Sequence, residues 1–309
     1  MRVSICTPTF NRRPFFASLI ACVAEQTYDH AWIEWIIADD GTDPIEDLVS
    51  EIPYVKYIKL EREEDGSPMP LGEKRALMHS YCTGDVIVNM DDDDYYPPSR
   101  VAHAVTELVA GRKATGALIA GCSELHVVSP AGMLYQFGPY RDNHATAATF
   151  AYFRELLDTT AYRADDVVGE EKAFLQGYTL PVTPLDPRLT ILVFMHPHNT
   201  INRQVLVDAG DRARVAPSPL SIADFFDVPA TRERVVAFYA NELPHLLAAY
   251  RPGEPARKKY VHLITQLKER VFTLEAAHAQ LAVENTVLRR QLQDKQDIIQ
   301  RLFAKLKTT

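Results

Sequence analysis

Four consecutive aspartates, Asp91 to Asp94, follow the largely apolar run Val-Ile-Val-Asn-Met at residues 86–90. Carboxylates held this close repel one another, so their ionised form requires a compensating cation or shifted pKa values. Oxygen ligands suit Mg²⁺ or Mn²⁺, which also share the phosphate oxygens of a substrate, whereas zinc calls for nearby His or Cys. The preceding run is typical of a buried parallel strand, and ligands of open α/β sheets bind at the carboxyl ends of strands. We therefore predict a metal and phosphate site here; the alternative is a solvated acidic turn.

Two earlier loops place polar residues at the ends of expected strands. Thr-Pro-Thr-Phe-Asn-Arg occupies residues 7–12, after the first strand, and Asp-Asp-Gly-Thr occupies residues 39–42, after the second. Asp-Gly is a common turn, so each loop taken alone indicates little. Because the carboxyl ends of neighbouring parallel strands meet at one edge of a sheet, these loops and the aspartate run can line one crevice.

The elements that must position these loops alternate between apolar runs and helix-like stretches from residue 1 to about 126, which is typical of βαβ units and a mostly parallel sheet. Residues 129 to about 200 mix turns, short strands and aromatic residues, and we expect them to elaborate one face of the sheet for an acceptor. The predicted domain covers residues 1–250, with a nucleotide-binding half at 1–126 and an acceptor-side half at 127–250. Strands are expected at residues 3–6, 33–38, 55–60, 86–90, 117–127 and 191–194, and helices at 15–26, 73–82, 99–110 and about 231–250.

A Pro/Gly-containing break at residues 251–256 predicts a linker, and residues 257–309 carry a heptad pattern. Leucine recurs at position d, and Asn285 supplies a polar residue at position a, which is how a parallel two-stranded coiled coil specifies its register. We therefore predict a homodimer formed through residues 257–309. The alternative is a lone amphipathic helix folded back on the globular body. The d-position leucines are Leu267, Leu274, Leu281, Leu288 and Leu302.

The composition is that of a globular protein, with 309 residues of which 47% are hydrophobic. A formal net charge of -8 and a pI near 5.7 argue against a nucleic-acid backbone or an anionic membrane as the main partner. The four cysteines show no CxxC spacing and are expected to be buried and reduced. No signal-peptide or membrane-span pattern is visible, so a cytoplasmic location is the expectation.

Motifs that occur in order over roughly residues 2–200 resemble those of the family-2 nucleotide-sugar glycosyltransferases of the GT-A fold. They are Pro-Thr-Phe-Asn-Arg at 8–12, Gln-Thr-Tyr at 26–28 with Asp-Asp-Gly-Thr at 39–42, Gly-Glu-Lys-Arg-Ala at 72–76, and Gly-Asp at 84–85 leading into the aspartate run. Ala76 departs from the asparagine that often follows the arginine. The resemblance implies an α/β fold of GT-A type, Rossmann-like, with a mostly parallel sheet flanked by helices. It also implies inverting transfer of a sugar from a nucleotide-diphosphate sugar to an acceptor hydroxyl, dependent on Mn²⁺ or Mg²⁺.

The resemblance also implies donor-binding residues. Asp40 matches the aspartate that holds the nucleobase or ribose, a directional task for a carboxylate acceptor. Arg75 can offer a planar fork to ribose or phosphate oxygens and Lys74 a point charge, although an ordinary surface charge is the alternative for Lys74. The predicted donor-binding residues are Pro8, Thr9, Asn11, Asp40, Lys74, Arg75, Asp91 and Asp92.

Two registers are open within the aspartate run, because alternate residues of an extended segment point to one side. Either Asp91 pairs with Asp93, or Asp92 pairs with Asp94. Alignment of Pro98 with the family's proline favours Asp93 on the metal, with Asp91 or Asp92 on the ribose. The predicted metal ligands are Asp93, Asp91, His196 and His198.

An acidic pair in Val-Gly-Glu-Glu-Lys at residues 168–172 resembles the family's catalytic acids near a helix start. Glu171 matches the base that takes the acceptor proton, and Glu170 is the alternative. Both acids could instead simply favour a helix N-terminus. His196, in Met-His-Pro-His-Asn-Thr at residues 195–200, matches a histidine that closes over the metal and diphosphate, with His198 as second choice.

Other functions are also possible for such a chain. A sugar-nucleotide-forming nucleotidyltransferase should have a glycine-rich phosphate loop after the first strand, and residues 7–11 contain no glycine. The non-enzymatic alternative is a dimeric scaffold or carbohydrate-binding protein with a degenerate GT-A site. The sugar, the nucleobase and the acceptor depend on loop shapes that the sequence does not specify.

Overall fold

The computed structural model describes residues 1–61, 68–166, 169–208 and 214–252, together with 285–286, 288–290, 292–293 and 295–296. The chain divides into two compact units, Met1–Arg257 and Lys258–Thr309. Residues 251–252 of the predicted linker are described, as are a few helical residues of the tail. The rest of the predicted linker and the coiled coil lie outside the described residues, so the dimer through 257–309 stays a prediction.

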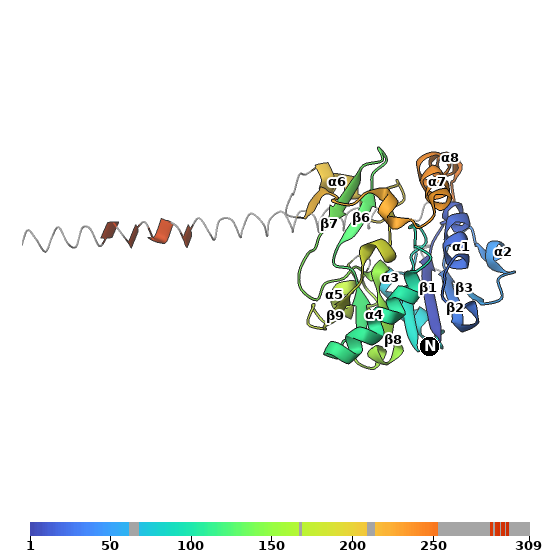
Figure 1. Cartoon of the computed structure of the whole chain (residues 1–309), viewed down its shortest axis with the longest axis horizontal. Coiled ribbons are helices and arrows are strands. Elements are labelled where there is room, and N and C mark those ends of the chain that lie inside the picture. Colours follow the sequence, from blue (N-terminus) through green and yellow to red (C-terminus); the bar gives the residue numbers. More distant parts are fainter. Residues whose placement is uncertain are drawn as a thin grey trace, which may run out of the picture. The chain divides into compact units, whose positions relative to one another are not determined.

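Within the described residues the main sheet has seven strands in the order β3-β2-β1-β4-β8-β5-β9 (Figure 1). β1 runs parallel to β2 and β4, β2 to β3, and β5 to β9, while β8 is antiparallel to β4 and β5. The predicted mostly parallel α/β sheet is therefore confirmed. The strand bounds are β1 Val3–Thr9, β2 Ile33–Asp39, β3 Val55–Lys59, β4 Val86–Asn89, β5 Ile119–Gly121, β8 Ala151–Phe153 and β9 Val182–Pro184.

The expected single strand at residues 117–127 is wrong, because the chain leaves the main sheet after Gly121. The backbone N–H of Cys122 donates to Oγ1 of Thr149 at 2.9 Å and not to a neighbouring strand. The chain then enters a second sheet, which in the described part of the chain has four strands in the order β10-β6-β7-β11. Their bounds are β6 Leu125–Val128, β7 Leu134–Phe137, β10 Val193–Phe194 and β11 Val215–Pro217.

Helices cover both faces of the main sheet because its central strands are apolar on both sides. Along β1, Ile5 packs into a cluster with residues of α1 and α4, whereas Cys6 packs into another with residues of α3 and α5. This alternation follows the two-residue period of a strand. The helix bounds are α1 Phe16–Ala24, α2 Glu46–Val49, α3 Leu71–His79, α4 Arg100–Thr115, α5 Glu171–Phe174, α6 Arg203–Asp208, α7 Pro229–Ala237 and α8 Leu243–Ala249.

The expected helix at about 231–250 is present as α7, a π-helical turn at Phe238–Glu242 and α8 in succession. α8 packs against the 3₁₀ turn Arg13–Phe15 that follows β1 (Figure 1). The end of the first unit thereby returns to its beginning, beside the loop that follows β1.

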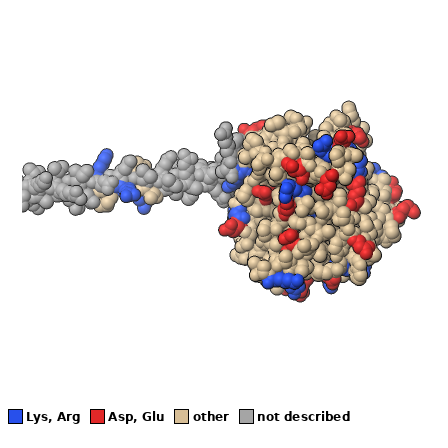
Figure 2. All heavy atoms as spheres, in the orientation of Figure 1, with Lys and Arg blue, Asp and Glu red and all other residues tan. Residues whose placement is uncertain are grey.

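All four cysteines lie in the described residues and are free and buried, as expected. Among the helices that the structure describes, none has the length and apolar character needed to cross a membrane. Acidic and basic side chains are interspersed over the face of the first unit shown in Figure 2.

Candidate active site

The polar loops meet at one edge of the main sheet, as the sequence predicts. β1 lies between β2 and β4 and runs parallel to both, so the chain leaves all three strands on the same side. Contacts between these segments confirm the convergence: Lys74 reaches the end of β1 and the loop after β2, and Arg12 reaches the aspartate run. Pro8 and Thr9 are the last two residues of β1.

Asp40 is fully buried and held by fixed partners. One of its oxygens pairs with the ammonium group of Lys74, and the other accepts a hydrogen bond of 2.6 Å from the backbone N–H of Met69. The same ammonium group donates to the carbonyl oxygen of Thr9 at 2.9 Å. Lys74 therefore neutralises and orients Asp40, which keeps lone pairs for a directional contact with a ligand.

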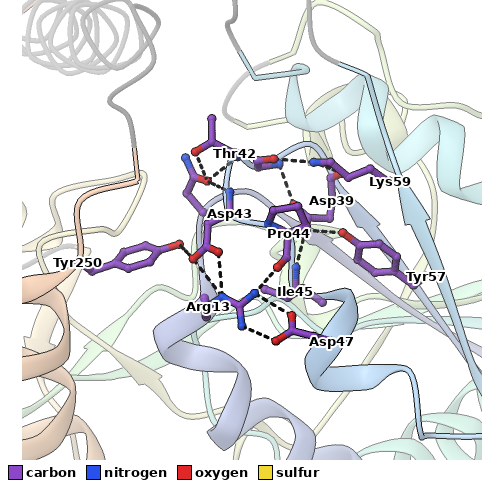
Figure 3. A network of polar contacts seen from close by, with 12 residues as sticks. Arg13, Asp39, Thr42, Asp43, Pro44, Ile45, Asp47, Tyr57, Lys59 and Tyr250 are labelled. Carbon is purple, nitrogen blue, oxygen red and sulfur yellow. Dashed lines mark hydrogen bonds and ion pairs between the residues drawn. The ribbon is translucent and has the colours of Figure 1, made fainter.

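The loop that follows Asp40 is shaped by its neighbours (Figure 3). Asp39 accepts hydrogen bonds from the backbone N–H groups of Gly41 (2.7 Å) and Ile45 (3.1 Å). Asn11 adopts a left-handed conformation with φ 54°, which asparagine tolerates, and its side-chain oxygen accepts from the Thr42 N–H at 2.8 Å. A Cβ on Gly41 would lie 2.8 Å from the backbone nitrogen of Asn11, so only glycine fits this approach. In this structure the Asn11 side chain positions the loop.

Arg75 connects the aspartate run with the acidic pair. Its Nε donates to Glu170 at 3.1 Å, and a terminal nitrogen donates to both carboxylate oxygens of Asp91 at 2.8 and 3.1 Å. Burial opposes the charge of Arg75, but the carboxylates of Asp91 and Glu170 outweigh it and raise its pKa well above the usual value. The other terminal nitrogen is buried and has no hydrogen-bond partner within the described structure.

Arg12 also lies beside the aspartate run, 3.8 Å from Asp92 and 3.6 Å from Asp93. One of its terminal nitrogens is also buried without a hydrogen-bond partner among the described residues. The sequence predicts no role for Arg12, although this residue directly follows Asn11 in the first motif. A second guanidinium at this edge, partly buried, is therefore a finding of the structure.

The aspartates differ in electrostatic environment. Burial acts to raise the pKa of Asp93, but Arg12 and His196 outweigh it and hold that pKa below its ordinary value. Burial raises the pKa of Asp92 to about 7 against the opposing charge of Arg12. Burial, together with the charge of Asp93, raises the pKa of Asp94 well above its ordinary value. Asp93 is thus held in its ionised form, which a cation requires.

His196 contacts Asp93 directly, with Nε2 3.2 Å from a carboxylate oxygen. The same Nε2 lies 2.8 Å from the amide nitrogen of Asn199, and Nδ1 is 3.2 Å from the backbone N–H of His198. A proton on Nε2 can be donated to Asp93. Nδ1 accepts from the His198 N–H, so the alternative tautomer, which carries its proton on Nδ1 and leaves Nε2 free for a cation, requires that hydrogen bond to break. Burial lowers the pKa of His196, which favours the neutral ring that metals bind.

The side chains beside Asp93 fit a cation that takes its remaining ligands from a substrate. Within the described residues no group of three or more His, Cys, Asp or Glu side chains is placed to hold a metal ion. Asp93 and His196 nevertheless offer an oxygen and a nitrogen within 3.2 Å of each other. Mg²⁺-type sites commonly use one or two protein ligands and take the remainder from phosphates and water.

The acidic pair lies at the start of α5. Glu170 is buried and bound to Arg75, whereas Glu171, the first residue of α5, is partly exposed. Burial raises the pKa of Tyr178, and the charge of Glu171 adds to this effect. The two acids therefore have different surroundings: Glu170 belongs to the buried ion-pair network, and Glu171 lies near a partly exposed aromatic side chain.

The raised pKa of Asp92 predicts a pH-dependent effect on stability. Its carboxyl group keeps a proton in the folded protein between its ordinary pKa of 3.8 and about 7, while the unfolded chain loses it. Stability is therefore lost as pH rises through this window. We expect the free energy of unfolding of Asp92→Asn at pH 8 to exceed that of the wild type by up to about 4 kcal/mol, so the variant unfolds at a higher urea concentration. Near pH 4 the two proteins should be equally stable. Urea titrations in EDTA at both pH values measure this difference. A difference that grows toward low pH would contradict the prediction. The control is Asp142→Asn, which replaces an exposed aspartate.

A mostly parallel α/β sheet flanked by helices, with polar loops at one edge, defines a fold of GT-A type. The chain belongs to Glycosyl transferase family 2, whose profile matches residues 4–159. S. aureus TarS 1-349 is 15% identical over 81% of this chain and 73% of that chain, with a TM-score of 0.47. The mannosyltransferase PcManGT from Pyrobaculum calidifontis, in complex with GDP-Man and Mn²⁺, is 17% identical over 87% of this chain and 80% of that chain, with a TM-score of 0.48. No curated protein matches the chain.

Proposed function

We propose that this protein transfers a sugar, with inversion, from a nucleotide-diphosphate sugar to an acceptor hydroxyl and depends on Mn²⁺ or Mg²⁺. The observation that carries the proposal is Arg75, whose guanidinium joins Asp91 to Glu170 through hydrogen bonds of 2.8 and 3.1 Å. One buried group thereby joins the aspartate run to Glu170, the residue next to the proposed base Glu171. Such an arrangement lets an acceptor hydroxyl approach a bound donor beside an acid.

Donor binding is assigned to the strand-end loops. Asp40, fixed by Lys74, accepts from the nucleobase or ribose. Arg12 and Arg75 each have a buried terminal nitrogen without a partner in the described structure, and phosphate oxygens would satisfy these donors. A divalent cation bound through Asp93, with His196 as a second ligand, would supply charge neutralisation of the leaving diphosphate.

Glu171 is the proposed base. The acceptor hydroxyl attacks the anomeric carbon from the side opposite the diphosphate, its proton passes to the Glu171 carboxylate, and the bond to the diphosphate oxygen breaks. Glu170 is held by Arg75 at 3.1 Å and so is better suited to position that guanidinium. Because the hydroxyl attacks from the side opposite the leaving diphosphate, the configuration at the anomeric carbon is inverted.

The proposal is tested with the purified full chain and a panel of UDP-GlcNAc, UDP-glucose and GDP-mannose in Mn²⁺. We expect at least one donor to raise the melting temperature, because a ligand of the native state stabilises it by mass action, and to be slowly hydrolysed. EDTA should remove the turnover and added Mn²⁺ should restore it. Binding without turnover, even with added acceptors, would favour the non-catalytic scaffold; turnover that is indifferent to EDTA would remove the metal from the proposal.

The tail is proposed to dimerise. Leu288 and Leu292, in the described part of the tail, have exposed fractions of 60% and 58%, and the sequence places them at positions d and a of the heptad. A second copy of the helix would bury both side chains.

A further inference from the structure

The loop that presents Asp40 is tied to the residue that directly follows α8. Tyr250 is the C-cap residue just after α8, and its hydroxyl donates a hydrogen bond of 2.9 Å to a carboxylate oxygen of Asp43 (Figure 3). Asp43 lies in the same loop as Asp40, between β2 and α2. A residue near the end of the first unit thus contacts the loop that we assign to donor binding.

Arg13 completes this contact from a third segment. Its Nε lies 3.0 Å from both oxygens of Asp43, and its terminal nitrogens donate to Asp47 at 3.0 and 2.7 Å. One terminal nitrogen also donates to the carbonyl oxygen of Pro44. The planar fork of arginine suits such paired contacts. We call Arg13, Asp43 and Tyr250 the loop latch.

The loop latch is well placed to set the loop's conformation. The Arg13 and Asp43 side chains are 31% and 33% exposed, and ion pairs this exposed contribute little to global stability. Asp39 and Asn11 hold the backbone part of the loop by accepting from its N–H groups. Arg13 and Tyr250 hold the side-chain part, at Asp43 (Figure 3). A loop fixed at both parts before binding avoids the entropy cost of ordering it when the ligand arrives.

We propose that Tyr250 is a positioning residue for donor binding: through Asp43 it holds the loop that presents Asp40 in its binding conformation. The inference rests on the proposed function, because Asp40 is the donor contact it serves. Tyr250 contributes to the affinity for the nucleotide and not to the chemical step, because neither Tyr250 nor Asp43 is among the residues assigned to proton transfer or to metal binding.

The test compares Tyr250→Phe with Tyr28→Phe in the full chain. Both variants lose one hydroxyl from a partly buried tyrosine, and Tyr28 donates at 2.7 Å to the carbonyl oxygen of Met1, away from the loop latch. For the tightest binder among UDP, GDP and ADP, we expect Tyr250→Phe to raise Kd and the donor KM about five-fold with kcat within about two-fold. Tyr28→Phe should leave all three unchanged. Equal Kd values for the two variants, or a lower kcat with unchanged KM, would overturn the proposal.

A second measurement separates this inference from the proposed function. The backbone amides of Gly41, Thr42, Asp43 and Ile45 should exchange with deuterium faster in ligand-free Tyr250→Phe than in the wild type. Arg13→Lys, which keeps the charge but loses the fork, should show the same effect. Unchanged exchange in both variants would rule out the loop latch. Failure of wild type to bind any of the three nucleotides would instead overturn the donor assignment.

Discussion

Asp93→Asn is expected to lower metal-dependent turnover of the sugar nucleotide about a thousand-fold while the protein stays folded. Asp93 is the aspartate of the run whose pKa is held below its ordinary value, and Nε2 of His196 lies 3.2 Å from it. The amide keeps the shape and one acceptor oxygen but loses the charge that a cation needs. A weaker apparent affinity for Mn²⁺ should accompany the loss.

The neighbouring Asp94 supplies a matched control. Burial, together with the charge of Asp93, raises its pKa well above the ordinary value and so favours the neutral carboxyl group, which asparagine resembles closely. Asp94→Asn should therefore retain most of the activity. Turnover and Mn²⁺ titrations of both variants, with melting curves to verify folding, make the comparison; full metal-dependent activity in Asp93→Asn would show that another residue holds the cation.

Glu171→Gln is expected to lower kcat about a thousand-fold and to leave nucleotide binding unchanged. Glutamine cannot accept the proton of the acceptor hydroxyl, but it disturbs neither the loop that holds Asp40 nor the buried Arg75. The measurement is kcat for transfer together with the Kd of the nucleoside diphosphate. A loss of binding as large as the loss of turnover would contradict the assignment of Glu171 as base.

Two further glutamates make this prediction specific. Glu170→Gln removes the charge that faces Arg75 at 3.1 Å, so it should affect donor KM as well as kcat. Glu155, paired with Arg112 at 2.8 Å and 46% exposed, offers a surface control whose replacement by glutamine should change neither value. If Glu170→Gln removes turnover and Glu171→Gln does not, the two acids exchange their roles.

Local pattern was enough to predict much of the fold. The apolar runs at residues 33–38 and 86–90 correspond to β2 and β4, and the polar residues after them lie at the shared edge. Where local pattern failed, a long-range contact was responsible. The strand expected at 117–127 is divided because the Cys122 N–H bonds to Thr149, far along the chain, and local sequence carries no signal of that contact.

The order of apolar and polar residues alone determined that this chain forms parallel strands with acidic and amide side chains at their ends, because strand period and burial are local properties. The tertiary structure decided which charges meet. Arg75 joins Asp91 to Glu170, and Tyr250 reaches Asp43, through contacts between segments distant in sequence. It also decided which of the aspartates stays ionised, because a pKa depends on burial and on neighbouring charges, and both are set only when the chain is folded.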